Sequence, residues 1–196
     1  MSDRTDVSYR AAKSRTGDRG RALPKTGDHA VVAGASISGL LAARVLADAY
    51  QAVTIVERDV LPDAVVPRKG VPQGRHAHGL LPSGAQVLED LFPGFLAGLV
   101  AAGVPVIGDF GELWFSAGGH LLCQDGRPDD PAYLASRPYL EDQVRRRVQA
   151  LPNVRITDGC ELAGLVTTPA RDRVTGARVL PRGGCTGGRW ARPSWS

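Results

Sequence analysis

The stretch from His29 to Glu57 constrains the fold more than any other part of the sequence. It begins with the short apolar run HAVVAG, typical of a buried strand, and continues into the glycine-containing turn GASISG. An apolar stripe at helical spacing follows, and then the β-branched run AVTIVE. Strand, glycine turn, helix and strand form a βαβ unit whose two strands are parallel neighbours. The sequence therefore predicts an α/β fold built on a parallel sheet.

The turn between the first strand and the helix lies where dinucleotide-binding folds place a pyrophosphate. Gly34 and Gly39 occupy the first and last glycine positions, and Ser36 stands where a second glycine is usual. Amide N–H groups at a bare helix start, helped by the helix dipole, would meet the phosphates. Taken alone, such a turn often serves only to redirect the chain. The expected cofactor contacts come from Gly34, Ser36, Ile37, Ser38 and Gly39.

An acidic residue ends the second strand. Glu57 lies eighteen residues after Gly39, where dinucleotide-binding folds use a carboxylate to accept hydrogen bonds from the ribose hydroxyls of the adenosine half. The alternative is a solvated charge at a strand end. An acid at this place disfavours a 2′-phosphate, so FAD or NAD is expected rather than NADP.

The rest of the chain alternates between helical and strand patterns. Pro82 is expected to start a helix that runs to about Leu91, and a second apolar helix should end at Gly103. A helix from Pro138 is expected with Arg145, Arg146 and Arg147 mostly outside its apolar stripe. The strand patterns are a hairpin around Gly118-Gly119, the strand NVRIT, and a hairpin of CELAGLVTT with DRVTGARVL.

Charge and composition narrow the classes of partner. The chain has 196 residues and a net charge of +4, enough length for one domain with a core. Residues 1–27 contribute +4 and residues 182–192 contribute +3, so the part between them carries about −3. Because a nucleic-acid-binding domain needs a basic face, the folded part is not expected to bind nucleic acid. Salt-dependent binding of DNA through the basic tails is the competing hypothesis.

The cysteines favour a reducing compartment, and the apolar runs predict no signal peptide or membrane span. Three cysteines without a C-x-x-C spacing favour neither a disulfide framework nor a zinc site. The first thirty residues contain no apolar signal region, and the run FLAGLVAAGVPVIG is too short and too rich in glycine to span a bilayer. A cytoplasmic protein without a membrane anchor is expected. No feature of the sequence specifies an oligomeric state.

Several segments in combination resemble FAD-dependent monooxygenases of the aromatic-hydroxylase type. They are the βαβ unit HAVVAGASISGLLAARVLADAYQAVTIVERD, the loop PRKGVPQGRHAHGLLPSGAQVLEDLFPG, and the later SRPYLEDQVRRRV and NVRITDGCELAGL. The resemblance runs from about His29 to Leu180 and implies a Rossmann-like FAD-binding domain with β-hairpin insertions. In such enzymes NAD(P)H reduces FAD, O2 is activated as a flavin C4a-hydroperoxide, and a small organic substrate is hydroxylated. No residue is identified here as a catalytic acid or base.

The resemblance also assigns roles to charged residues. Arg75 is the candidate for approaching the FAD phosphates, and His76 and His78 become loop residues near the isoalloxazine rather than metal ligands. No metal site is expected, because two histidines without a third ligand do not make one. Arg137 resembles a second polar residue that contacts FAD, with a solvent-facing arginine at a helix end as the alternative. Arg58 resembles a neighbour of the adenine or ribose.

The chain departs from this family near its end. The family continues with an apolar strand and with Asp-Gly and Gly-Asp motifs, none of which follows Leu180. We therefore expect a disordered basic tail at 1–27, an incomplete, C-terminally truncated FAD-binding domain at 28–180, and an irregular tail at 181–196 that is out of frame with the ancestral gene. The alternative function is a non-catalytic nucleotide-binding module or an inactive remnant.

Overall fold

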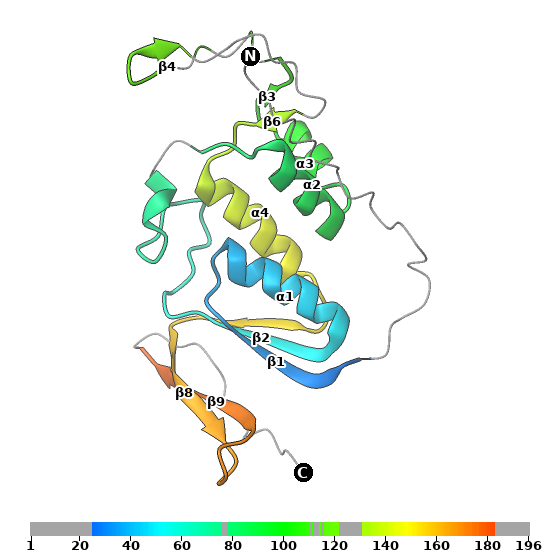
Figure 1. Ribbon diagram of the computed structural model, residues 1–196, viewed down its shortest axis with the longest axis vertical. Helices are drawn as coiled ribbons and strands as arrows, with labels where there is room; N and C mark the ends of the chain where they lie inside the picture. The colour runs from blue at the N-terminus through cyan, green and yellow to red at the C-terminus, as the bar shows by residue number, and fades with distance from the viewer. Residues whose placement is uncertain are drawn as a thin grey trace, which may run out of the picture.

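The computed structural model describes residues 25–75, 78–109, 111, 114, 116–121 and 131–182 (Figure 1). The helices are α1 (Ile37–Ala49), α2 (Pro82–Leu91), α3 (Phe95–Ala101) and α4 (Arg137–Gln149), with the short 3-10 helix η1 (Pro72–Arg75). The strands are β1 (Gly27–Ala33), β2 (Tyr50–Val56), β3 (Val106–Ile107), β4 (Ser116–Ala117), β5 (His120–Leu121), β6 (Ala132–Tyr133), β7 (Val154–Thr157), β8 (Cys160–Thr167) and β9 (Val174–Pro181).

A parallel three-stranded sheet in the order β1-β2-β7 forms the centre of the fold. Val53 of β2 lies in register with Ala30 of β1 and with Val154 of β7. Helices α1 and α4 lie side by side over one face of this sheet, and the β8–β9 hairpin extends beyond its other side (Figure 1). The predicted parallel pairing of the first two strands, and with it the α/β class, is confirmed.

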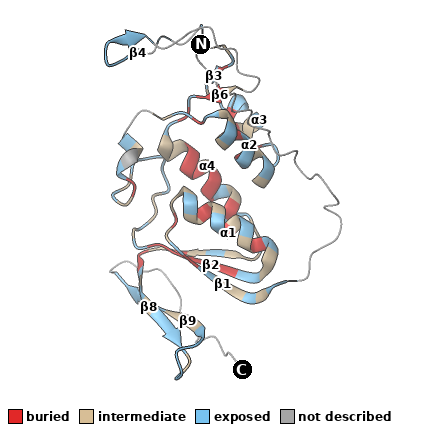
Figure 2. Cartoon of the chain, viewed as in Figure 1, coloured by how far each residue is buried: buried red, intermediate tan, exposed pale blue. Residues whose placement is uncertain are grey.

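The core lies between the sheet and the two helices. Apolar residues of β2, α1 and α4 form one buried cluster, and Figure 2 shows buried positions in red on these elements. Since burial of apolar area is the main favourable term in folding, this contact holds α4 against the βαβ unit although the two are far apart in sequence. The largest fully buried side chains in this layer are Leu40, Val53, Ile55, Leu140, Val144 and Val148.

A pair of short helices extends this core. Pro93 interrupts the helical pattern as expected, and α2 and α3 follow one another across a turn at Gly94. The carboxylate of Glu89 accepts hydrogen bonds from the N–H groups of Leu96 and Gly94, which hold its pKa below the ordinary value. The guanidinium of Arg147 lies 4.6 Å from the centre of the Phe95 ring and ties α4 to α3.

The smaller strands agree with the sequence patterns in most places. Gly118 and Gly119 form the turn between β4 and β5, and both have positive φ. The long hairpin of β8 and β9 is also confirmed. The antiparallel pair β3–β6 was not expected, because two-residue strands leave no periodic signal. The expected tails fall largely on residues 1–24 and 183–196, which lie outside the described residues.

The burial of Arg145 in α4 was not predicted. The sequence places the Arg145 side chain outside the apolar stripe, but the structure leaves that residue only 6% exposed. Its Nη2 atom donates to the Pro62 carbonyl at 3.0 Å and to the Asp142 carboxylate at 2.9 Å. The loop that follows β2 packs on this side of the helix, so a face that looks solvent-exposed in the sequence is covered by another segment.

Strand β1 forms one edge of the sheet. Within the described residues it pairs with β2 alone, and Val31 in this strand is 43% exposed.

No helix in the described part of the chain is long and apolar enough to cross a membrane.

Replacing Gly39 with alanine should lower the free energy of unfolding by about 1–3 kcal/mol, the usual cost of overpacking. The new Cβ would overlap the carbonyl oxygen of Gly34, a backbone atom that has no freedom to move aside. Urea denaturation of the full chain measures the effect. Gly164→Ala is the control, because a Cβ there meets nothing within 4 Å. An equal loss in both variants would contradict a close approach at Gly39.

Candidate functional site

The turn between β1 and α1 has the conformation that its glycines allow. Gly34 has a φ of 90°, which an L side chain rarely adopts, and its N–H donates to the Val56 carbonyl at 2.8 Å. Gly39 lets the first turn of α1 lie directly against the carbonyl of Gly34. Ser36 is the N-cap residue, but its side chain makes no capping hydrogen bond and the first helical turn contains no acidic residue. The start of α1 is therefore open to an anion.

A cavity of about 320 Å³ lies beside this turn, at the carboxyl ends of β1 and β2. In open parallel sheets this is the edge at which ligands bind. Four of the residues expected from the sequence line it: Gly34, Ser36, Glu57 and Arg58. The remaining lining residues are Ala33, Val56, Arg68, Gly70, Cys160, Glu161 and Leu162.

Glu57 is buried at the base of the cavity with only 5% of its surface exposed. One carboxylate oxygen, Oε2, accepts a hydrogen bond from the Ala35 N–H at 2.6 Å and lies 3.3 Å from Nη1 of Arg68. The other, Oε1, accepts from the Asp59 N–H at 3.0 Å. Glu57 therefore holds the glycine turn in place through the backbone of Ala35, and it is not the solvated strand-end charge that the sequence left open.

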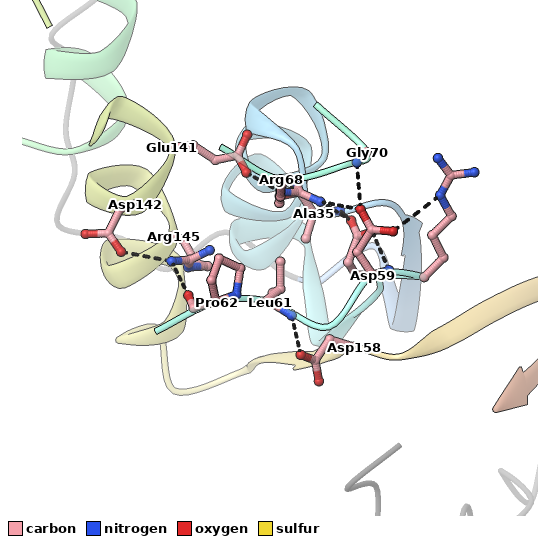
Figure 3. Close-up of polar contacts among 12 residues, drawn as sticks. Ala35, Asp59, Leu61, Pro62, Arg68, Gly70, Glu141, Asp142, Arg145 and Asp158 are labelled. Carbon is pink, nitrogen blue, oxygen red and sulfur yellow. Dashed lines mark hydrogen bonds and ion pairs between the residues drawn. The ribbon is translucent and has the colours of Figure 1, made fainter. Parts of the chain in front are cut away.

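Arg68 is the largest addition that the structure makes to the expected site. Its side chain is only 8% exposed and reaches from the loop after β2 toward α4 (Figure 3). Its Nε donates to Glu141 at 2.6 Å and its Nη2 donates to the Ala35 carbonyl at 2.9 Å. Asp59 is a further acidic neighbour, 3.7 Å from Nη1. The sequence offered a signal in the excess of positive charge after the second strand, but not which arginine would turn inward.

The β8–β9 hairpin closes one side of the cavity. The Cys160 N–H donates to the Glu57 carbonyl at 2.9 Å, which places the start of β8 next to the acid. Glu161 follows, with its carboxylate half-exposed and 3.2 Å from Nη1 of Arg182. Sequence reasoning identified this hairpin but did not connect it to the site, because the connection depends on where the sheet ends.

The other predicted residues lie apart from the cavity lining. Ile37, Ser38 and Gly39 form the first turn of α1 behind Ser36, while Arg75 ends η1 and Arg137 begins α4. A second, much smaller cavity of about 10 Å³ lies between the η1 segment and α4. Its lining includes Arg68, Glu141 and Arg137, and Arg68 also lines the cavity beside the glycine turn.

His78 lies close enough to Arg137 for their charges to interact. Burial lowers the pKa of the imidazole from its ordinary value, and the positive charge of Arg137 lowers it further. His76 lies outside the described residues. Within the part of the chain that the structure describes, no group of three or more His, Cys, Asp or Glu side chains could hold a metal ion.

The fold is shared with flavin monooxygenases. PqsL, a probable FAD-dependent monooxygenase from Pseudomonas aeruginosa, superimposes with a TM-score of 0.58 at 18% identity, over 78% of this chain and 38% of PqsL. PqsL in complex with 2-aminobenzoylacetate gives 0.59 at 19% identity, over 78% and 39%. The p-nitrophenol 4-monooxygenase PnpA from Pseudomonas putida DLL-E4 gives 0.51 at 19% identity, over 80% and 39%.

A sequence relative is more similar but much longer. Protein Rv3254 of Mycobacterium tuberculosis is 50% identical over 149 residues, which cover 74% of this chain and 30% of that protein. No family model matches the chain. The chain thus spans less than two-fifths of the proteins it resembles.

Glu57→Gln should lower the free energy of unfolding by about 1–3 kcal/mol even without a nucleotide, the cost of leaving buried donors unsatisfied. A glutamine keeps the shape but loses the charge that faces Arg68, and its amino group cannot accept from a backbone N–H. Chemical denaturation of the ligand-free chain tests this. Glu161→Gln is the matched control from the same cavity wall, and a similar loss in both would show that Glu57 does not hold the turn.

His78 should titrate at lower pH than histidine in an unstructured peptide, as measured by NMR. The unfolded chain then binds the proton more tightly than the folded one. The contribution of His78 to stability is therefore complete above its ordinary pKa and is lost as the pH falls through that value to the lower, folded one. Arg137→Gln should raise the folded-state pKa only part of the way, because burial is the larger cause. An unchanged pKa of His78 in that variant would show that the charge of Arg137 does not act on His78.

Proposed function

We propose that the chain is the FAD-binding portion of a flavin-dependent monooxygenase. The observation that supports this most directly is the cavity at the carboxyl ends of β1 and β2, where a glycine turn with positive φ, an open helix start and a buried acid meet. These features suit a pyrophosphate next to a ribose. The fold shared with PqsL and PnpA favours FAD as the dinucleotide that binds there.

The pyrophosphate would lie against the start of α1. Gly34 has no side chain that would obstruct it, Gly39 lets the helix start lie against the turn, and the N–H groups of Ser36, Ile37 and Ser38 at the open helix end would donate to it. The helix dipole adds an attraction for negative charge at this point. Phosphate recognition would thus be carried by the backbone, which agrees with the absence of a capping side chain at Ser36.

The adenosine half would lie beside Glu57 and Arg58. A carboxylate has about four lone-pair sites for hydrogen bonds. In Glu57 the Ala35 N–H occupies one site at Oε2 and the Asp59 N–H one site at Oε1, while the Arg68 guanidinium lies 3.3 Å from Oε2. Among the described residues Oε1 has this one hydrogen-bond donor, which leaves a site for a ribose hydroxyl. Glu57 would therefore bind the ribose while it continues to hold the turn, with Arg58 as a more exposed neighbour on the same wall.

The flavin end is assigned to the loop and helix start that contain Arg75, His78 and Arg137. Arg137 carries a buried Nε that has no hydrogen-bond partner among the described residues, and its charge already acts on His78. FAD, when bound, would supply the redox chemistry by accepting a hydride from NAD(P)H and activating O2. The chain's residues would bind and orient FAD, and hydroxylation of a small organic substrate is proposed for the whole protein.

A non-catalytic nucleotide-binding module is the second candidate. The observation in its favour is that the described lining of the cavity offers groups suited to binding a nucleotide, and none of those residues is assigned the role of a catalytic acid or base. Oxidation of NADH or NADPH by the FAD-loaded chain separates the two candidates. FAD binding without that oxidation supports the module.

Ser36→Asp should lower the affinity for FAD by roughly tenfold or more, because its carboxylate would meet the pyrophosphate at short range. Thermal stability should be unchanged or higher, since Asp is as good an N-cap as Ser and favours the helix dipole. Flavin fluorescence titration of the full chain measures the affinity. Ser36→Ala, which has no capping hydrogen bond to lose, is the control. Equal affinity in the Asp variant and the natural chain would argue against this location.

A further inference from the structure

Both polar groups of Ala35 are held by buried charged side chains. The carboxylate of Glu57 accepts from its N–H at 2.6 Å, and the guanidinium of Arg68 donates to its carbonyl at 2.9 Å. Ala35 itself is completely buried in the turn, one residue after Gly34. The two peptide planes that flank Ala35 are therefore fixed from opposite ends.

This arrangement sets the direction of a backbone donor that the cavity needs. In a trans peptide the C=O and the following N–H point in opposite directions within one plane. Because the Ala35 carbonyl points at Arg68, the N–H of Ser36 points away from Arg68. Ser36 lines the cavity and caps the open start of α1. The orientation of the first amide at this helix start thus depends on Arg68.

Arg68 is in turn held by helix α4. Its Nε donates to Oε1 of Glu141 at 2.6 Å, and the Glu141 side chain is only 6% exposed. Glu141 does not belong to the described lining of the cavity beside the glycine turn. The three nitrogen positions of Arg68 already have partners in Glu141, Glu57 and Ala35, although the residue itself lines the cavity.

We propose that Arg68 is a positioning residue of the nucleotide site, and that Glu141 makes α4 part of that site by holding Arg68 against the carbonyl of Ala35. The proposal rests on nucleotide binding at this cavity, as proposed above. Arg68 acts through the peptide group between Ala35 and Ser36 and not by touching the ligand. It therefore affects recognition of phosphate more than recognition of adenosine.

The test compares two arginines in matched surroundings. Arg145 resembles Arg68 in that its side chain is 8% exposed, pairs with a buried acid of α4 and donates to a loop carbonyl, that of Pro62 (Figure 3). It differs in that it does not line the cavity. Arg68→Lys and Arg145→Lys keep the positive charges but lose the forked geometry, since an ammonium cannot reach three separate groups as a guanidinium does.

The ligands are ADP and adenosine, titrated by calorimetry into each folded full-length variant. We expect Arg68→Lys to lower the affinity for ADP by roughly tenfold, which is the scale of one charge-assisted hydrogen bond. The affinity of this variant for adenosine should change by no more than about twofold. In Arg145→Lys the affinities for both ligands should stay within the same limit of about twofold. A merely structural role would weaken ADP and adenosine by the same factor, and that result would overturn the proposal, as would unchanged ADP affinity.

Glu141→Gln supplies an independent measurement if Arg68→Lys folds poorly. This variant keeps the shape of α4. In the natural background it should lower the affinity for ADP but not the affinity for adenosine. In the Arg68→Lys background it should cause no further loss, because the path from Glu141 to the turn runs through the Arg68 guanidinium. Additive losses would contradict this path. Failure of the natural chain to bind ADP or FAD would overturn the proposed function and this inference together, whereas binding that Arg68→Lys leaves intact overturns the inference alone.

Discussion

The buried guanidinium of Arg68 joins segments that the sequence separates widely. It connects the end of β2 through Glu57, the glycine turn through Ala35 and the first half of α4 through Glu141. Each of these segments also has apolar contacts of its own, but apolar packing is not directional and does not orient a peptide plane. The hydrogen bonds of Arg68 have fixed geometry. They give the backbone groups at the edge of the cavity a defined orientation, which apolar packing alone does not provide.

The charges in this cluster do not balance by ion pairing alone. Glu57, Asp59 and Glu141 lie around one arginine, and two of these acids are almost fully buried. Backbone N–H groups provide part of the compensation, because Ala35 and Asp59 donate to Glu57 and Gly70 donates to Asp59 at 2.9 Å, and Arg58 lies 3.8 Å from Asp59 as a second arginine. A buried carboxylate is tolerated only when such donors replace water. The loop from 57 to 70 is thus shaped by the acids that it encloses.

The extent to which the sequence predicted this structure depends on the range of the interaction. The βαβ unit, the break at Pro93 and the β8–β9 hairpin were correct, because glycine, proline and apolar periodicity act over a few residues. Gly34, Ser36, Glu57 and Arg58 were also brought together, because a turn and a strand end are neighbours by construction. Arg68 and Glu141 were missed, since they meet across 73 residues and nothing local distinguishes Arg68 from Arg75. The burial of Arg145 was not predicted for the same reason, because its partner Pro62 lies 83 residues away in the sequence.

The strand order has a consequence for how the chain acquires its fold. The unit β1–α1–β2 closes through local contacts, but β2 gains its second neighbour only when Val53 pairs with Val154, about a hundred residues later. Contacts of such long range form late, because the loop entropy must be overcome first. During synthesis on the ribosome, the glycine turn therefore emerges and bends long before α4 exists to hold Arg68. The nucleotide cavity is begun by the segment from β1 to β2, its Arg68 is held only once α4 has been made, and its last described wall is the start of β8.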